Sequence, residues 1–197
     1  FALIGHHSHT HEYLIDMTND DFIKDIEIAS KIFQEKLGYI PEIFSYPFGE
    51  YSNFMKNYIS KNFKVAFGQH SGVIDKNKDK FELPRFPINE KYGNLERFKS
   101  LINYYPLEYK SLRPLEKKIS DKDNPPQLII DFFKNQKNIN NISCYSNDGG
   151  KWKKSNLIFK GQSLIINFDE KFIPRRGRIN CSLNDNGKWR WFGTQFT

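Results

Sequence analysis

The chain has 197 residues, of which 38% are hydrophobic and 27% are charged, and its formal net charge is +7. This composition excludes an intrinsically disordered chain, and the lack of any run of about 18 apolar residues excludes a membrane-spanning helix. The Lys residues are scattered, so a solvated basic surface is favoured over nucleic-acid binding.

The stretch IGHHSHTH, residues 4–11, contains four of the five histidines. His7 and His11 are four positions apart, so on one helical turn they would share a face and could bind one metal ion. Imidazole pairs suit Zn²⁺, Co²⁺ or Ni²⁺. His6 and His9 form a second pair that would face differently, and an exposed His-rich turn is the alternative interpretation.

Helix and strand patterns alternate along the first half of the chain. Thr18 or Asn19 can cap a helix whose apolar residues follow the i, i+3, i+4 spacing until Gly38 ends it. A buried strand, a second helix capped by Ser52 and another strand, KVAFGQ, follow. With a third helix over about 94–104, this order predicts an α/β layer or barrel.

The composition changes within residues 106–126, where Pro, Lys and Asp replace apolar periodicity. We expect an α/β domain over residues 1–110, a linker over 111–126 and an antiparallel β-sandwich over 127–197. Residues 1–5 have the pattern of the middle of a buried strand, so we also expect a segment upstream of residue 1.

Cysteine and tryptophan residues occur on the predicted strands of the sandwich. Cys144 and Cys181 could form a disulfide, as in a secreted or periplasmic protein, or remain two buried thiols. Trp189 and Trp191 share one face of the last strand, which we predict to be the sandwich core, with a sugar-stacking platform as the alternative.

Several motifs in order resemble the polysaccharide deacetylases of carbohydrate esterase family 4. IGHHSHTH is similar to their second motif, in which both histidines that match His7 and His11 bind the metal. FSYPFGEY, AFGQHSG with LPRFPIN, and the tail RGRINCSLNDNGKWRWFGTQF resemble the later segments of a subgroup related to poly-N-acetylglucosamine deacetylases. The fold that this resemblance implies is part of a distorted β/α deacetylase barrel followed by the sandwich.

The resemblance implies metal-dependent deacetylation of an N-acetylated polysaccharide by a periplasmic or secreted enzyme. A metal-bound water would attack the acetamide carbonyl, with an Asp as general base and a His as general acid. The family's first motif, a pair of aspartates, is absent from this sequence, and so is the acid His. We therefore expect these residues on an N-terminal fragment of the same protein, present as a separate chain.

Asp20 and Asp21 could replace the aspartate pair, but acids are also favoured in the first turn of a helix, which is the interpretation we adopt. Ser45 stands where the family has a base-orienting Arg, and Arg85 could supply that guanidinium instead. Arg85 either orients the base in this way or is a surface or structural Arg.

Substrate contacts are predicted at a turn and at one further histidine. The turn can form the floor of a sugar-binding groove, with core packing as the alternative for its aromatic residues. His70, on a glycine-flanked loop, could contact substrate or be exposed. The predicted substrate-binding residues are Tyr46, Pro47, Phe48, Gly49 and His70.

The main alternative to an enzyme is a catalytically inactive carbohydrate-binding or scaffold protein on the same fold. The absent aspartate pair favours it.

Overall fold

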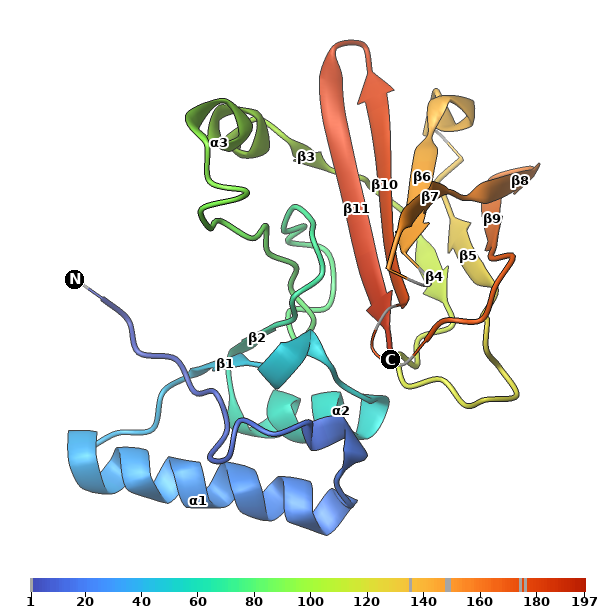
Figure 1. The fold of residues 1–197 in the computed structure, drawn as a ribbon. Coiled ribbons are helices and arrows are strands. Elements are labelled where there is room, and N and C mark those ends of the chain that lie inside the picture. The colour runs from blue at the N-terminus through green and yellow to red at the C-terminus, as the bar shows by residue number, and fades with distance from the viewer. Residues whose placement is uncertain (1, 135, 148–149, 174, 176) are drawn as a thin grey trace. The chain divides into compact units, whose positions relative to one another are not determined.

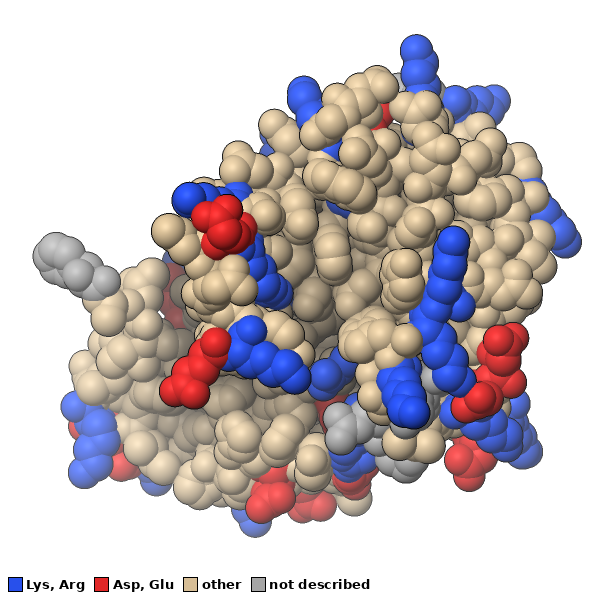
Figure 2. All heavy atoms as spheres, turned by 45° about the horizontal axis from the view of Figure 1, so that its top comes forward, with Lys and Arg blue, Asp and Glu red and all other residues tan. Residues whose placement is uncertain are grey.

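The computed structural model describes residues 2–134, 136–147, 150–173, 175 and 177–197. The chain divides into two compact units, Phe1–Gln69 with Lys76–Leu83, and His70–Asp75 with Pro84–Thr197 (Figure 1). No helix in the described part is long and apolar enough to cross a membrane. On the face drawn in Figure 2, Lys and Arg side chains are interspersed with Asp and Glu, in agreement with a dispersed basic surface.

Helices dominate the first unit, and their ends lie close to the predicted positions. The Thr18 hydroxyl accepts a hydrogen bond from the amide of Asp21, Ser52 does the same for Met55, and Gly38 ends the first long helix with φ of 77°. The elements are η1 (Leu14–Asp16), α1 (Asn19–Leu37), β1 (Ile43–Ser45), η2 (Pro47–Gly49), α2 (Asn53–Asn62) and β2 (Val65–Phe67).

A small parallel sheet lies at the centre of this unit. β1 pairs with β2, and single-residue parallel bridges at His6 and Leu83 extend the pair on either side. Among the described residues there is no closed barrel, because two short strands and two bridges cannot close a sheet on itself. The buried strand predicted over residues 1–5 is also wrong for its described part, since Leu3 is 88% exposed.

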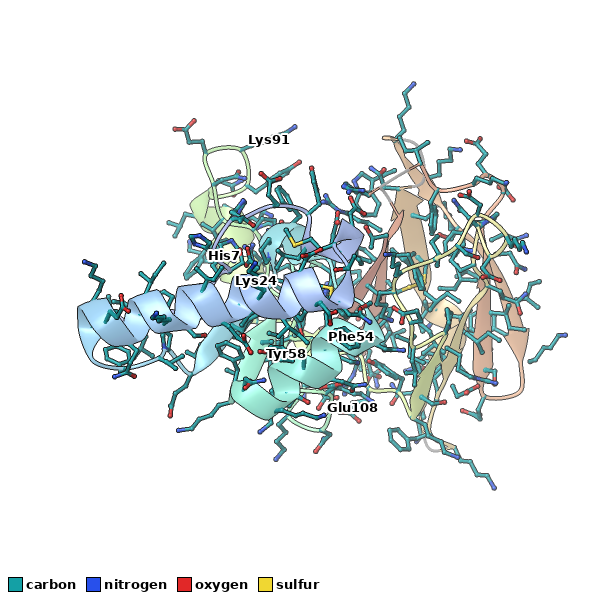
Figure 3. The ribbon with its side chains drawn as sticks, turned by 90° about the horizontal axis from the view of Figure 1, so that it is seen from below. His7, Lys24, Phe54, Tyr58, Lys91 and Glu108 are labelled. Carbon is teal, nitrogen blue, oxygen red and sulfur yellow. A yellow bond between two sulfur atoms is a disulfide. The ribbon has the colours of Figure 1, made fainter. Side chains whose placement is uncertain are left out.

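One apolar core joins α1, α2 and the sheet of the first unit. Phe22 of α1 packs edge-on against Phe54 and Tyr58 of α2, and Figure 3 labels these last two side chains on α2. Phe44 of β1 and Ile59 of α2 are fully buried in the same cluster. Burial of this cluster fixes β1, whose last residue, Ser45, precedes the turn over residues 46–49.

The second unit contains one short helix and most of the strands. A five-stranded sheet has the order β3-β11-β10-β6-β7, and a four-stranded sheet has the order β4-β5-β9-β8. The elements are α3 (Leu95–Ile102), β3 (Tyr105–Pro106), β4 (Ser111–Arg113), β5 (Leu128–Asp131), η3 (Ile139–Asn141), β6 (Ser143–Asn147), β7 (Trp152–Lys154), β8 (Asn156–Lys160), β9 (Ser163–Asn167), β10 (Gly177–Asp185) and β11 (Lys188–Phe196).

Both sheets contribute side chains to one apolar cluster, including Ile130 of β5 and Ile179 of β10. The structure joins Cys144 and Cys181, which face each other on β6 and β10, in a disulfide. A sandwich of the two sheets stays a prediction. The core position predicted for Trp189 is wrong, since this side chain is 45% exposed.

The stretch predicted to be a linker, 111–126, contributes structure to the second unit. It contains β4, in which Leu112 is buried, and the carbonyl of Lys117 accepts a hydrogen bond from the amide of Thr197. Contacts therefore place residues 84–126 with the strands that follow, whereas composition suggested a boundary at residue 110. Proline and charge marked the stretch as polar but could not reveal these pairings.

Candidate functional site

His7 and His11 lie side by side in the loop that follows the His6 bridge. Their ring centroids are 4.8 Å apart with an interplanar angle of 70°. The Nδ1–H of His7 donates to the carbonyl oxygen of Ser45 at 2.6 Å, which leaves its Nε2 as the free ligand atom. The two rings meet because the loop curls, with positive φ at Ser8 and His11, so the predicted helical turn is wrong although the two side chains do come together.

Asp25 of α1, which the sequence analysis did not single out, holds this loop on the helix. Its carboxylate accepts hydrogen bonds from the amide of His9 at 2.8 Å, the amide of Thr10 at 3.0 Å and the hydroxyl of Thr10 at 2.7 Å. The side chain is buried. The sequence did contain a sign of this role, because Asp25 lies between Phe22 and Ile26 on an otherwise apolar helix face. A carboxylate buried on such a face needs hydrogen-bond partners.

His6 has a different environment from the other three histidines of the motif. It is fully buried, and its ring packs against Phe33, Phe44 and Phe63. Its Nδ1 accepts from the amide of Ser8, and desolvation lowers the pKa of its imidazole to about 4. His6 is therefore a neutral core histidine, whereas the side chain of His9 is exposed.

The turn over residues 46–49 places one aromatic ring beside the histidine pair. The Phe48 ring lies 5.0 Å from that of His11 and stacks on Tyr13 at 4.0 Å, with φ of 57° at Phe48. Tyr46, Pro47 and Gly49 are buried instead, which is the core-packing alternative. A Cβ on Gly49 would lie 2.4 Å from the amide nitrogen of Gln69, so only glycine permits this close approach.

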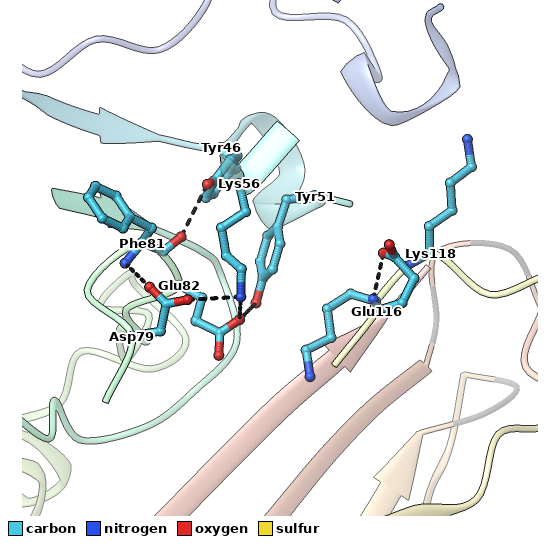
Figure 4. Close-up of polar contacts among 9 residues, drawn as sticks. Tyr46, Tyr51, Lys56, Asp79, Phe81, Glu82, Glu116 and Lys118 are labelled. Atoms are coloured by element: carbon cyan, nitrogen blue, oxygen red, sulfur yellow. Dashed lines mark hydrogen bonds and ion pairs between the residues drawn. The ribbon is translucent and has the colours of Figure 1, made fainter. Parts of the chain in front are cut away.

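A polar network fixes the other side of this turn (Figure 4). Lys56 of α2 forms ion pairs with Asp79 and Glu82, both at 2.9 Å. The hydroxyl of Tyr46 donates to the carbonyl of Phe81, and that of Tyr51 donates to Glu82. Burial, followed by the nearby carboxylates, raises the pKa of both tyrosines, so they remain neutral hydrogen-bond donors.

Arg85 and His70 belong to the second unit, so their roles toward the histidine pair stay predictions. The amide of Arg85 donates to the carbonyl of His70 at 3.0 Å. His70 is buried rather than exposed, and desolvation, followed by the charge of Lys117, lowers its pKa to about 3. A buried neutral imidazole at this position is inconsistent with the surface-exposure alternative.

The described residues contain no group of three or more His, Cys, Asp or Glu side chains that could hold a metal ion. Asp20 and Asp21 lie in the first turn of α1, and Asp21 accepts a hydrogen bond from the Thr18 hydroxyl. Their predicted structural role is therefore confirmed. The histidine pair offers two of the three protein ligands that a catalytic zinc site uses.

Comparison with known proteins gives one match. Residues 2–65 match the family model of the polysaccharide deacetylases, a range that includes both paired histidines, Asp25 and the 46–49 turn. No curated protein and no solved structure matches the chain. The resemblance noted in the sequence is thus confirmed at the level of the family, while the subgroup and the motifs beyond residue 65 stay predictions.

Proposed function

We propose, on the premise that residues 2–65 belong to the polysaccharide deacetylase family, that this chain carries part of a metal-dependent N-deacetylase site. Its reaction is hydrolysis of the acetamide bond of an N-acetylated polysaccharide. The observation that carries the proposal is the contact between the His7 and His11 rings, together with the hydrogen bond that orients His7.

The donor set of this loop fits a borderline divalent cation. The Ser45 carbonyl fixes the tautomer of His7, as partners in the outer shell of metal-binding histidines commonly do. Zn²⁺, Co²⁺ or Ni²⁺ would be held by His7 and His11, and such an ion supplies Lewis acidity to a carbonyl oxygen and lowers the pKa of water. Zn²⁺ is the ion we favour.

A third ligand, a general base and a general acid are needed to complete the site. We propose that an N-terminal fragment of the same protein, as a separate chain, supplies an aspartate pair and a histidine. Arg85 would orient the base, and His70 would contact substrate. The aspartate pair and the histidine are what the family resemblance implies, whereas the roles of Arg85 and His70 are our own proposals for this chain.

Phe48 would form the part of the substrate groove beside the metal ligands. Its ring is fixed between Tyr13 and His11, so it presents a rigid apolar surface there. Such a surface can pack against the apolar face of a sugar ring or an acetyl methyl group. Tyr46, Pro47 and Gly49 support it from below, because they are buried in the turn that carries it.

The disulfide between Cys144 and Cys181 supports the proposal that the protein is periplasmic or secreted, since such bonds persist in oxidising compartments.

An inactive carbohydrate-binding or scaffold protein is the second candidate. It is favoured by the absence, within the described residues, of a third metal ligand near the pair. The two candidates differ in whether acetate is released.

The test is acetate release from N-acetylated chitooligosaccharide or poly-N-acetylglucosamine, with added Zn²⁺ and all polypeptides of the purified sample present. We expect metal-dependent release that His7→Ala abolishes. His9→Ala is the matched control, because the exposed His9 anchors the same loop through its amide alone. Absence of metal-dependent release would favour the inactive protein.

A further inference from the structure

All three tryptophans of the chain project from one face of the five-stranded sheet. Trp189 and Trp191 lie on β11 opposite Asn184 and Ser182 of β10. Trp152 of β7 lies opposite Asn147 of β6. Residues alternate between the faces of a strand, and the alternate positions on these strands, such as Cys181 and Phe192, are in the apolar core. The tryptophans therefore occupy the outer face.

Much of the aromatic surface on this outer face is open. Trp152 is 48% exposed, Trp189 45% and Tyr145, the diagonal neighbour of Trp152, 46%. Trp191 is partly covered, because its ring packs against Phe86 and Tyr104. Exposed tryptophan is an unusual use of the largest apolar side chain, and it is common where flat ligands bind.

Short polar side chains lie between the aromatic residues. The outward positions of β10 are Arg178, Asn180, Ser182 and Asn184, which separate the tryptophans of β11 from Tyr145 and Trp152. Amide and hydroxyl groups can both donate and accept hydrogen bonds, as sugar hydroxyls do. Beyond Trp189 the outer face of β11 is covered, because the Ser71 carbonyl lies against Gly193 and Gln195 is buried. The open part runs from Trp189 across Asn184 and Ser182 to Tyr145 and Trp152, and it crosses three strand spacings, roughly 14 Å, which suits several sugar rings rather than one.

Lys154 of β7 is an exposed cation on this face, and no Asp or Glu occurs at the described outward positions of β6, β7, β10 and β11. Cationic donors complement the electron-rich carbonyl oxygens of acetamido groups, and they repel the ammonium groups that deacetylation creates.

We propose that the outer face of the five-stranded sheet is a glycan-binding surface that takes an N-acetylated polysaccharide strand in preference to its deacetylated form. Trp152, Tyr145 and Trp189 stack on sugar rings, and Asn184 and Ser182 bind hydroxyl groups. This preference for the acetylated strand rests on the proposed function, whereas the site itself is separate from the histidine pair.

The proposal can be tested by titrating the full chain with N-acetylated chitohexaose and with fully deacetylated chitohexaose. Because every tryptophan of the chain lies on this face, a change in tryptophan emission reports binding there directly. We expect such a change with the acetylated oligosaccharide, and affinity by calorimetry at least tenfold weaker for the deacetylated one. Trp152→Ala and Tyr145→Ala should each weaken binding about tenfold, and Trp152→Phe should retain most of it.

Two controls separate this surface from the deacetylase site. Phe133→Ala removes an equally exposed aromatic side chain of the second unit that lies outside the sheet, so it should leave binding unchanged. His7→Ala should also bind normally even if it abolishes acetate release. Binding that is lost in His7→Ala but unaffected by Trp152→Ala and Tyr145→Ala would overturn the proposal, as would equal affinity for both oligosaccharides or no binding to either.

Discussion

The two units stabilise their functional surfaces in different ways. In the first unit the histidine loop is held by the buried carboxylate of Asp25, and the half-buried Lys56 pairs with Asp79 and Glu82. In the second unit the sheet that carries the tryptophans lies on an apolar cluster and is crosslinked by a disulfide. A single polar substitution should therefore affect the first unit strongly and locally, and the second unit only weakly.

The largest expected effect follows from substitution of Asp25. Asp25→Ala removes three hydrogen bonds that hold the loop, so the His7–His11 geometry should relax and zinc affinity should fall about 100-fold, as for losses in the outer shell of metal sites. Asp25→Asn keeps one acceptor oxygen, so its loss of zinc affinity should be smaller. Calorimetric zinc titration measures both, and wild-type affinity in Asp25→Ala would show that the loop is held by other contacts.

Reduction of the disulfide should destabilise the second unit alone. A crosslink between residues 37 positions apart restricts the unfolded chain, so Cys144→Ser with Cys181→Ser should lower the free energy of unfolding by about 3 kcal/mol. Denaturant unfolding followed by tryptophan emission reports this unit, and zinc affinity serves as the control for the first unit. A loss of zinc affinity in the double variant would contradict the prediction that the disulfide stabilises the second unit alone.

A smaller effect is expected from Lys56→Met, which leaves Asp79 and Glu82 without their shared cation. The side chain of Lys56 is only 13% exposed, so unfolding free energy should fall by about 2 kcal/mol. Lys64→Met breaks the exposed ion pair with Glu42 and should change stability by less than about 1 kcal/mol. Thermal unfolding compares the two variants, and equal effects would refute a specific role for the network.

A pH dependence is expected in the second unit. Burial lowers the pKa of His70 to about 3, below its value near 6.5 in the unfolded chain. The unfolded state therefore binds more protons between these values, so this contribution to stability is complete above pH 6.5 and declines as the pH falls toward 3. His70→Gln should flatten the slope of unfolding free energy over this range. An unchanged slope would mean that His70 does not stay neutral in the folded chain.

Local sequence signals were sufficient for the helices and for the histidine pair. Thr18, Ser52 and Gly38 act at short range, so caps and ends could be predicted from neighbouring residues. The clamp by Asp25 could not, because it joins residues 15 and 16 positions apart through a loop with left-handed backbone. Spacing predicted that His7 and His11 come together, and their rings are in contact, but a curled loop rather than a helix brings them together.

Alternation along the last strand predicted correctly that Trp189 and Trp191 share a face, but it could not say which face is covered. That depends on which side of the sheet meets the apolar residues of β5 and β9, a contact between distant segments. The polar stretch 111–126 was misread for the same reason, because its partners are Asp131 and Thr197.

The most direct test of the histidine site is a zinc titration of the chain and of His7→Ala, His11→Ala and His9→Ala, followed by calorimetry. The account predicts one zinc site that is lost in both His7→Ala and His11→Ala and retained in His9→Ala. Unchanged zinc binding in His11→Ala, or equal loss in all three variants, would contradict the assignment of His7 and His11 as the metal ligands.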